Sequence, residues 1–466
     1  MGDDGRQQEP TGGARPRPAR LGMAVVLAVA LAILPLAPAQ AAPPAAARPT
    51  VAGATVSVPS SPVGRQLAWL LSLTQLPLSA AEVTAHFDAA FLAQADPSQL
   101  NAALESLSAT GHQTLLAVRD VEPTSLVAVV EFGTTRYTAQ LSVDPTGLIA
   151  GLRFTPDATL PKSWSAVDRE LVSVAPRVSL LAARVGAGGT CVPVRSVAAS
   201  TPRPLGSMFK LFVLGALARA VQAHKVSWTQ EMTVTAAVKV GGSGTLHDDA
   251  DGTQLTVEQV ATKMISVSDN TAADMLLGLL GRPAVEAQVR RWTAHPSLDT
   301  PFLTVAELFA LKYHDFPAMA DHYLSLAPSA RARYLASTVD ALSATSERQS
   351  GSPRDVSSIE WFASADDLCR AFAGLAALGA EPGLSPLQTI LSANDGGIQL
   401  SPGTWPTVWF KGGSEPGVLT LGYLARDTAG QTYVVVALTE DPRRALAADA
   451  TTDLLATVAG AFALLH

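Results

Sequence analysis

Ser207 and Lys210 are the first pair of residues whose types and spacing suit nucleophilic chemistry. They open an apolar helical run and lie three positions apart, which places both side chains on one helical face. A serine hydroxyl is a weak nucleophile until a neighbour accepts its proton, and a partly desolvated lysine can be that base. A helix N-terminus also favours negative charge on the serine oxygen. Taken alone, however, the pair is more often a cap serine with a solvated lysine.

A second segment, Ser268-Asp269-Asn270, lies in a loop between two amphipathic helical runs. The Ser268 hydroxyl can relay a proton there, and the Asn270 amide can hold an amide group of a substrate. The Asp269 carboxylate more plausibly braces the loop by accepting backbone hydrogen bonds. Taken alone, these three residues are better explained as a helix-capping turn.

A third segment, Lys411-Gly412-Gly413-Ser414, ends a late strand. Lys411 and Gly413 share one face of that strand, because side chains alternate along it. Gly413 lets another backbone approach closely, and Lys411 offers positive charge for a substrate carboxylate. The backbone N–H groups of Ser414 and Ser207 could form an oxyanion hole. The alternative for this segment is an ordinary turn at the end of a strand.

The three segments are individually weak, but they occur together in the order and in the helix, loop and strand contexts that one acyl-transfer site requires. We therefore predict two sets of site residues. The catalytic set is Ser207, Lys210, Ser268 and Lys411, and the substrate-binding set is Asn270, Gly413 and Ser414. The eight histidines are scattered, so neither a metal site nor a cofactor is predicted.

The elements that position these segments lie in residues 160–466. A helix at Ser163–Leu171, two early strands, a helical middle, three late strands and a final helix predict one antiparallel sheet of five strands flanked by helices. The predicted strands are Val178–Val185, Cys191–Ala198, Thr407–Phe410, Val418–Ala425 and Thr432–Leu438. Residues 62–158 have helical runs followed by four short strands, which predicts a separate small α+β domain without a chemical motif. The chain of 466 residues is long enough for two domains.

The N-terminus has the features of a secretory signal peptide. Arginines precede an uncharged apolar run, Leu21–Leu36, and Ala39-Gln40-Ala41 supplies the small residues of a cleavage site. We predict a signal peptide over residues 1–41, a linker over residues 42–61 and a secreted protein. A membrane anchor is the alternative, but the run is shorter than the roughly 20 residues that a spanning helix needs, and no later segment could span a bilayer.

The bulk composition argues against nucleic acid as a partner and does not settle whether the two cysteines pair. The net charge of −7 is spread along the chain without a basic run, which argues against nucleic acid as a partner. The two cysteines, Cys191 and Cys369, could form a disulfide in an oxidising compartment or remain as buried free thiols.

The segments GSMFK, MISVSDNTAADMLL and FKGGS resemble the signature motifs of class A β-lactamases and related penicillin-binding proteins. The resemblance covers roughly residues 160–466 and implies a β-lactamase/transpeptidase-like domain with an acyl-serine mechanism. In that mechanism Ser207 attacks, Lys210 is a base, Ser268 and Asn270 assist, and Lys411 and Ser414 hold the substrate carboxylate.

The whole chain is similar to a narrower group, the two-domain actinobacterial proteins typified by a cephalosporin-esterase-like protein of clavulanic acid gene clusters. The segments SGTLHDDADGT, DTPFLTVAELFALK and FKGGSEPGVL carry this resemblance. It implies an NTF2-like (cystatin-like) fold for residues 62–158, with no catalytic residue transferred there.

The chain departs from class A enzymes where their E-x-x-L-N loop supplies the glutamate that activates water for release of the acyl group. Arg282–Thr300 contains no such motif. Glu307 is the nearest substitute, but it lies in a helical run and is expected to be an exposed helix residue. Glu415, beside Ser414, is the other candidate. Gly412 also occupies a position where the family often has threonine.

The sequence predicts an exported acyl-serine hydrolase acting on a small-molecule β-lactam, an ester or a D-alanyl peptide. Weak esterase or β-lactam-binding activity is expected rather than fast β-lactam hydrolysis, because a deacylating base is missing. The alternative from another class is a binding protein for β-lactams or peptidoglycan, associated with the cell wall, that does not turn over. A third hypothesis gives the N-terminal domain an isomerase-like function.

Overall fold

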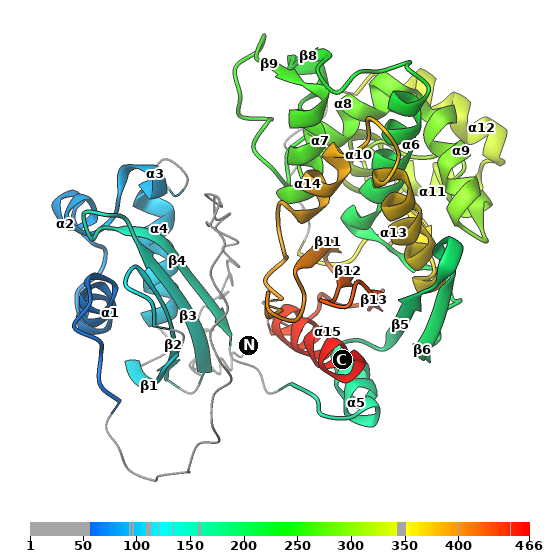
Figure 1. Ribbon diagram of the computed structural model, residues 1–466. Coiled ribbons are helices and arrows are strands. Elements are labelled where there is room, and N and C mark those ends of the chain that lie inside the picture. The colour runs from blue at the N-terminus through cyan, green and yellow to red at the C-terminus, as the bar shows by residue number, and fades with distance from the viewer. Residues whose placement is uncertain are drawn as a thin grey trace, which may run out of the picture. The chain divides into compact units, whose positions relative to one another are not determined.

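The structure is a computed structural model, and it describes residues 56–92, 95, 97–108, 113–119, 121–133, 135–156, 160–342, 351–398, 400–447 and 449–466. The predicted signal peptide and most of the predicted linker lie outside the described residues. The chain divides into two compact units, with the main boundary between Arg153 and Phe154 (Figure 1). The domain limits given above stay predictions.

The first unit has helices followed by a sheet. Its helices are α1 (Pro62–Ser72), α2 (Ala80–His86), α3 (Ala89–Leu92) and α4 (Pro97–Ser108). Its strands, which form one sheet in chain order, are β1 (Gln113–Arg119), β2 (Ser125–Phe132), β3 (Thr135–Val143) and β4 (Ile149–Pro156). Helix α1 packs against β1 and β2, and this α+β arrangement is the one predicted. The NTF2-like resemblance stays a prediction.

The second unit is built on a five-stranded antiparallel sheet, as predicted. Its strands are β5 (Arg177–Val185), β6 (Cys191–Val197), β11 (Thr407–Glu415), β12 (Val418–Arg426) and β13 (Thr432–Glu440). Their order in the sheet is β11-β12-β13-β5-β6, so the three late strands lie beside the two early ones. The inner strands β12, β13 and β5 are buried along most of their length, because both faces of the sheet are covered there, whereas the edge strand β6 is largely exposed.

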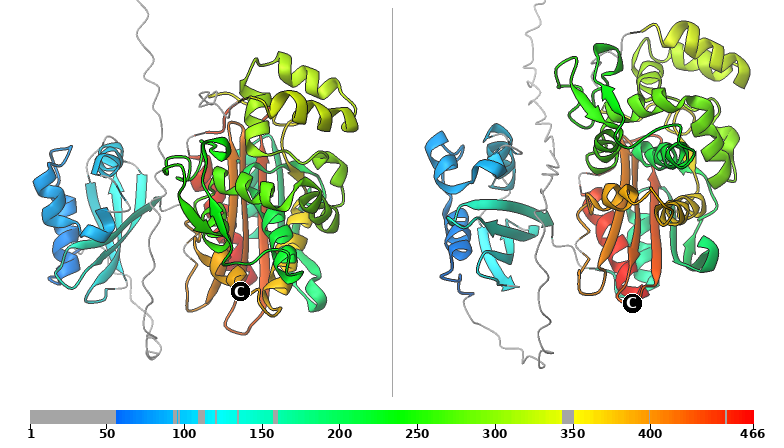
Figure 2. Two further views of the ribbon diagram at one scale, coloured as in Figure 1. Left: turned by 90° about the horizontal axis from the view of Figure 1, so that it is seen from above. Right: turned by 45° about the horizontal axis from the view of Figure 1, so that its top comes forward.

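Helices cover both faces of this sheet (Figure 2). Alternate residues of β13 show the division: Val434 and Val436 belong to the larger core under the helical layer, whereas Val435 and Ala437 belong to the smaller core under α5 (Trp164–Val174) and α15 (Ala450–Leu465).

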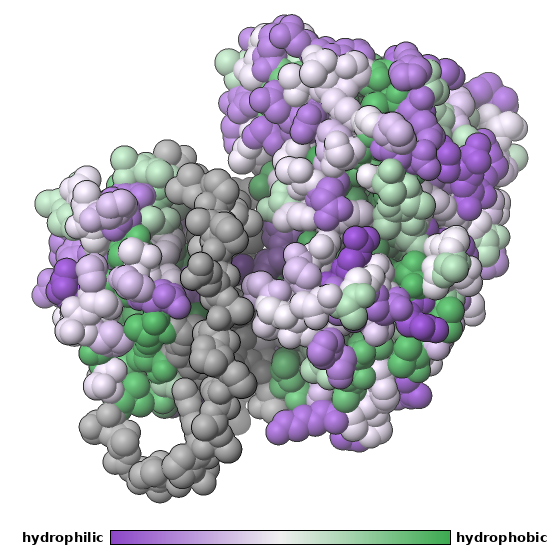
Figure 3. Space-filling view, viewed as in Figure 1, coloured by the Kyte–Doolittle hydropathy of each residue, from purple (hydrophilic) through white to green (hydrophobic). Residues whose placement is uncertain are grey.

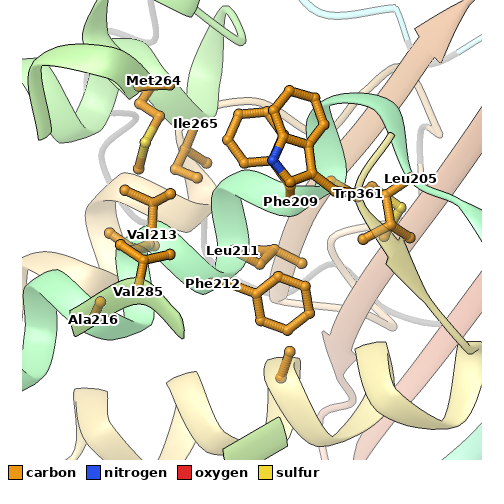
Figure 4. Close-up of a cluster of buried hydrophobic side chains, with 14 of the residues drawn as sticks. Leu205, Phe209, Leu211, Phe212, Val213, Ala216, Met264, Ile265, Val285 and Trp361 are labelled. Atoms are coloured by element: carbon orange, nitrogen blue, oxygen red, sulfur yellow. The ribbon is translucent and has the colours of Figure 1, made fainter. Parts of the chain in front are cut away.

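The helical layer is assembled around α6 (Lys210–Gln222), whose residues Lys210 to Ala218 are all buried. Around it lie α7 (Val257–Ser266), α8 (Asn270–Leu280), α9 (Arg282–Trp292), α10 (Val305–Tyr313), α11 (Ala318–Ser325), α12 (Pro328–Tyr334), α13 (Ala365–Gly379) and α14 (Pro386–Ser392). Figure 4 shows the apolar side chains that α6 contributes to the core. The outer surface of this layer is mainly hydrophilic on the face seen in Figure 3, as expected for helices that bury their apolar sides inward.

The structure shows how the two cysteines are used and whether a described helix could cross a membrane. Cys191 on β6 and Cys369 on α13 form a disulfide with their Cα atoms 6.3 Å apart, so the edge of the sheet is bonded to the helical layer. Among the described residues, no helix has both the length and the apolar character needed to cross a bilayer.

Candidate active site

Ser207 lies in a short 3₁₀ turn, Gly206–Phe209, that leads directly into α6. The predicted apolar helix therefore begins three residues later than Ser207, at Lys210, but the spacing still brings the two side chains together. The Lys210 Nζ lies 3.1 Å from the Ser207 Oγ, and the Lys210 side chain is completely buried. Phe209, which follows within the turn, stacks on Trp361 with ring centroids 3.7 Å apart (Figure 4).

Lys210 is surrounded by groups from the Ser268-Asp269-Asn270 loop. Its Nζ donates hydrogen bonds to the Asn270 Oδ1 at 2.8 Å, to the Ser268 Oγ at 3.2 Å and to the Ser268 carbonyl oxygen. Burial lowers the pKa of Lys210 well below its usual range, and the nearby charge of Lys411 lowers it further. An amine in this environment gives up its own proton readily, so it can accept one from the neighbouring hydroxyl.

Ser268 stands between the two buried lysines. The Lys411 Nζ donates to the Ser268 Oγ at 2.9 Å and to the Gly412 carbonyl oxygen at 2.6 Å. Burial lowers the pKa of Lys411 to about 7. Ser268 has a φ of +58°, a strained backbone conformation for a residue with a side chain, and this turn carries its hydroxyl between the two amines.

The remainder of this loop is fixed by its own side chains. The Asp269 carboxylate caps α8 and also accepts hydrogen bonds from the backbone N–H groups of Thr245 and Leu246, at 2.7 and 2.9 Å. This is the bracing that the sequence predicted. The Asn270 amide donates to the Gly241 carbonyl oxygen at 2.9 Å, so both ends of this side chain have protein partners.

Strand β11 lies directly against the turn that carries Ser207. A Cβ atom on Gly413 would lie 2.5 Å from the Ser207 nitrogen, and one on Gly206 would lie 2.8 Å from the Ser414 nitrogen. Only glycine permits this approach, which is what Gly413 was predicted to allow. The structure thus brings all seven predicted site residues into one region, with the Ser207 and Ser414 backbones side by side.

The prediction for Glu307 was wrong. Its side chain is 1% exposed, because it forms a capping box with Thr304 at the start of α10 and an ion pair with Arg282, whose Nη2 lies 2.6 Å from the Glu307 Oε1. A carboxylate in the first turn of a helix is stabilised by the N-terminal N–H groups, and the arginine compensates for its burial. Glu415 is occupied as well, since both of its oxygens bind the Lys312 Nζ, at 2.6 and 2.7 Å.

Sequence reasoning missed three charged residues near the site: Lys312 and Glu360, which are buried, and Asp274, which is half-buried. The Asp274 carboxylate, on α8, accepts hydrogen bonds from the N–H groups of Val305 and Ala306 at 2.8 and 2.9 Å. Burial raises the pKa of Asp274 to about 7. The available signal was a single charge within each apolar run, such as AADMLL and LFALKY, because a charge buried among apolar residues needs a partner. Within the described part of the chain, no cluster of His, Cys, Asp and Glu side chains could hold a metal ion.

Two family models match the chain. Residues 178–376 match a model described as "Beta-lactamase enzyme family", and residues 58–149 match one described as "ORF 12 gene product N-terminal". The five-stranded antiparallel sheet flanked by helices, together with the family match over residues 178–376, gives the second unit the β-lactamase/transpeptidase-like fold that was predicted.

Several solved structures are similar to this chain. A β-lactamase from Sphaerobacter thermophilus is 21% identical, with 64% of this chain and 96% of that chain covered and a TM-score of 0.45. A penicillin-binding protein, PBP-A, is 17% identical, with coverages of 66% and 98% and a TM-score of 0.44. The putative class A β-lactamase PenP from Rhodopseudomonas palustris is 18% identical, with coverages of 65% and 98% and a TM-score of 0.45. No curated protein matches the chain.

Proposed function

We propose that this protein is an exported acyl-serine hydrolase in which Ser207 is the nucleophile and Lys210 is its base. The observation that carries the proposal is the 3.1 Å separation between the Ser207 Oγ and the nitrogen of a completely buried lysine. A pure binding site would not need an amine with a lowered pKa beside the hydroxyl. The predicted signal peptide is the basis for placing the protein outside the cytoplasm, where association with the cell wall is part of the proposal.

The chemistry follows from the positions of these groups. Neutral Lys210 takes the proton of Ser207 as the oxygen attacks the substrate carbonyl, and the N–H groups of Ser207 and Ser414 stabilise the oxyanion. Ser268, which contacts both lysines, returns a proton to the leaving group. Lys411 supplies positive charge for a carboxylate of the substrate. The product of this half-reaction is an ester between Ser207 and the acyl group.

Release of the acyl group is proposed to be slow. The sequence contains no E-x-x-L-N motif, and the two nearby glutamates, Glu307 and Glu415, are held by Arg282 and Lys312. The oxygens of both carboxylates are already engaged, those of Glu307 by Arg282 and the Thr304 N–H and those of Glu415 by Lys312, so neither is placed to activate a water. Weak esterase or β-lactam-hydrolysing activity is therefore proposed, rather than fast turnover.

The test is intact-mass spectrometry of the folded protein after incubation with a penicillin, a cephalosporin and a simple acyl ester. We expect an adduct with the mass of the acyl group on the wild type, located at Ser207 by peptide mapping. Ser207→Ala should give none, and Lys210→Met should acylate about 10²- to 10⁴-fold more slowly, the range that a positioned base contributes. A folded wild type that gains no mass from any of the three compounds would rule out the proposal.

The second candidate is a β-lactam- or peptidoglycan-binding protein that acylates once and does not turn over. The engagement of both glutamates favours it. The same experiment separates the two candidates: an adduct that decays over minutes to hours indicates a hydrolase, whereas one that persists indicates the binding protein.

A further inference from the structure

A buried group of three charged residues lies behind the proposed oxyanion hole, and none of them has a part in the mechanism above. Lys312 near the end of α10, Glu360 and Glu415 have side chains that are 0%, 2% and 12% exposed. The Lys312 Nζ binds both oxygens of Glu415 and lies 3.9 Å from the Glu360 Oε1. Burying an ammonium group is costly unless carboxylates compensate for it, so the three side chains form one unit.

Glu360 fixes the backbone on one side of the site. Its Oε2 accepts hydrogen bonds from the N–H of Gly206 at 3.2 Å and from the N–H of Trp361 at 2.8 Å. Trp361 is itself immobilised, because its ring stacks on Phe209 and its Nε1 donates to the Leu303 carbonyl oxygen at 3.0 Å. The residue before Ser207 is therefore held by a carboxyl group that cannot easily move.

Glu415 fixes the backbone on the other side. It is the last residue of β11 and directly follows Ser414, and its partner across the sheet is Val418. Both of its oxygens are held by Lys312, so the end of β11 is tied to α10. Arg354 secures that end of the helix, since its Nη1 donates to the Lys312 carbonyl oxygen at 2.8 Å.

We propose that Lys312, Glu360 and Glu415 are positioning residues that hold the N–H groups of Ser207 and Ser414 at the spacing that an oxyanion requires. The inference rests on the proposed function. The Lys312 ammonium group lies between the Glu360 and Glu415 side chains. Glu360 accepts a hydrogen bond from the N–H of Gly206, the residue before Ser207, and Glu415 is the residue after Ser414. Oxyanion stabilisation depends on donors that are already in place before the charge develops, so this ion cluster contributes to the acylation rate and not to substrate affinity.

The protonation of Glu360 suggests a conservative substitution. Burial raises the pKa of Glu360 well above its usual range, and the neighbouring charge of Glu415 raises it further, so protonation of this side chain is favoured. Glutamine has the shape of a protonated glutamic acid, and its carbonyl oxygen can accept the same two backbone hydrogen bonds. Leucine fills a similar volume without any acceptor.

The test measures the acylation rate constant and the dissociation constant separately, with a fluorescent penicillin and the full-length protein. Lys312→Met and Glu360→Leu should acylate about 10- to 100-fold more slowly, somewhat less than the loss of an oxyanion-hole donor, with a dissociation constant within about threefold of the wild type. Glu360→Gln should remain within about threefold of the wild type. In the double variant Lys312→Met/Glu415→Gln, the loss should be no larger than in Lys312→Met alone, because the two residues act as a unit.

Arg195→Met is the matched control, since Arg195 lies on β6, at the opposite edge of the sheet from β11, and its replacement removes the cation of an ion pair with Asp168 on α5. It should acylate like the wild type. If Lys312→Met does not fold, the comparison of Glu360→Leu, Glu360→Gln and Glu415→Gln carries the test. If Glu360→Leu and Glu415→Gln, measured separately, both acylate like the wild type, this inference is wrong and the proposed function still stands. A wild type that is never acylated would overturn both the proposed function and the inference.

Discussion

Lys210 and Lys411 both contact the Ser268 hydroxyl, but their surroundings give them different protonation behaviour. Burial lowers the pKa of Lys411 to about 7, whereas Lys210 experiences burial and the charge of Lys411 together, so its pKa falls well below the usual range. At neutral pH Lys411 is partly charged, and the lowered pKa of Lys210 favours the neutral form that a base needs. Two lysines at one site are therefore suited to two roles: proton acceptor and anion partner.

Binding of a carboxylate-bearing substrate should weaken as the pH rises above about 7. Lys411 loses its charge in the free protein over this range, while a bound carboxylate favours the charged form, so each pH unit should raise the dissociation constant by up to about tenfold until the pKa of the complex is reached. Titration with a fluorescent penicillin on Ser207→Ala, which cannot form the ester, measures this directly.

An uncharged acyl ester is the control for this titration, and its affinity should not depend on pH between about 6 and 9. A dissociation constant for the penicillin that stays constant over the same range would show that Lys411 is not its carboxylate partner.

The sequence was most informative for side chains that act through simple spacing. Ser207 and Lys210 lie in one helical turn, and the acceptor role of Asp269 follows from its position before a helix. Glu307 was misjudged because its partner, Arg282, lies 25 residues away and its burial depends on how α9 and α10 pack. Lys312, Glu360 and Glu415 were not connected for the same reason: the longest of these sequence separations is 103 residues, and only the fold brings them together.

At the scale of elements, all five strands of the main sheet of the second unit were predicted, because runs rich in valine and leucine ended by glycine or aspartate leave few alternatives. The strand β11 is longer than its predicted range, Thr407–Phe410, and continues through Lys411 to Glu415. Glycines have low strand propensity, so the sequence indicated an early end. The pairing with β12 and contact with the Gly206–Phe209 turn keep this stretch extended.

The disulfide is the covalent link between two of these elements. It joins β6 to α13 and closes a loop with a sequence separation of 178 residues. The cysteines could not be paired from sequence, because their separation carries no information about distance. Closing a loop of this size reduces the entropy of the unfolded chain and should stabilise the fold by roughly 3–5 kcal/mol.

Replacing both cysteines, as Cys191→Ser/Cys369→Ser, should therefore lower the free energy of unfolding by about 3–5 kcal/mol. Urea denaturation of the oxidised wild type and of the double variant measures the difference. Acylation of the folded variant should be unchanged, since β6 lies at the opposite edge of the sheet from β11. Equal midpoints for the two proteins would contradict this account of the disulfide.

The whole second unit contains an unusual balance of buried ionisable groups. Burial raises the pKa of Asp274 to about 7 and lowers that of Lys411 to about 7, from ordinary values of 3.8 and 10.5. Burial also raises the pKa of Asp299 and of Glu360 and lowers the pKa of Lys210. These groups favour their uncharged forms in the folded protein, whereas in the unfolded chain they are charged at neutral pH. Their burial therefore lowers the free energy of unfolding most near neutral pH.

The signs of the two effects predict a stability minimum near pH 7. As the pH rises from about 4 to 7, the unfolded chain has already released the Asp274 proton while the folded protein retains it, so stability falls. From about 7 to 10, the folded protein has released the Lys411 proton while the unfolded chain retains it, so stability rises. Each shift corresponds to a change on the order of 4 kcal/mol.

Urea denaturation at about pH 5, 7 and 9 tests this expectation on the wild type, Asp274→Asn and Lys411→Met. Between about pH 5 and 7, Asp274→Asn should lose less stability than the wild type, and between 7 and 9 Lys411→Met should gain less. Parallel pH profiles for all three proteins would show that neither group titrates with a shifted pKa.

The contact between Gly206 and Gly413 has a consequence for how such a site can diversify. Two backbone segments contact each other there with no side chain between them, so the distance between the Ser207 turn and β11 is set by main-chain packing and cannot be adjusted one methyl group at a time. New specificities on this scaffold must therefore come from the peripheral walls, such as the loop around Gly241 and Thr245, while the gap between the glycines remains constant.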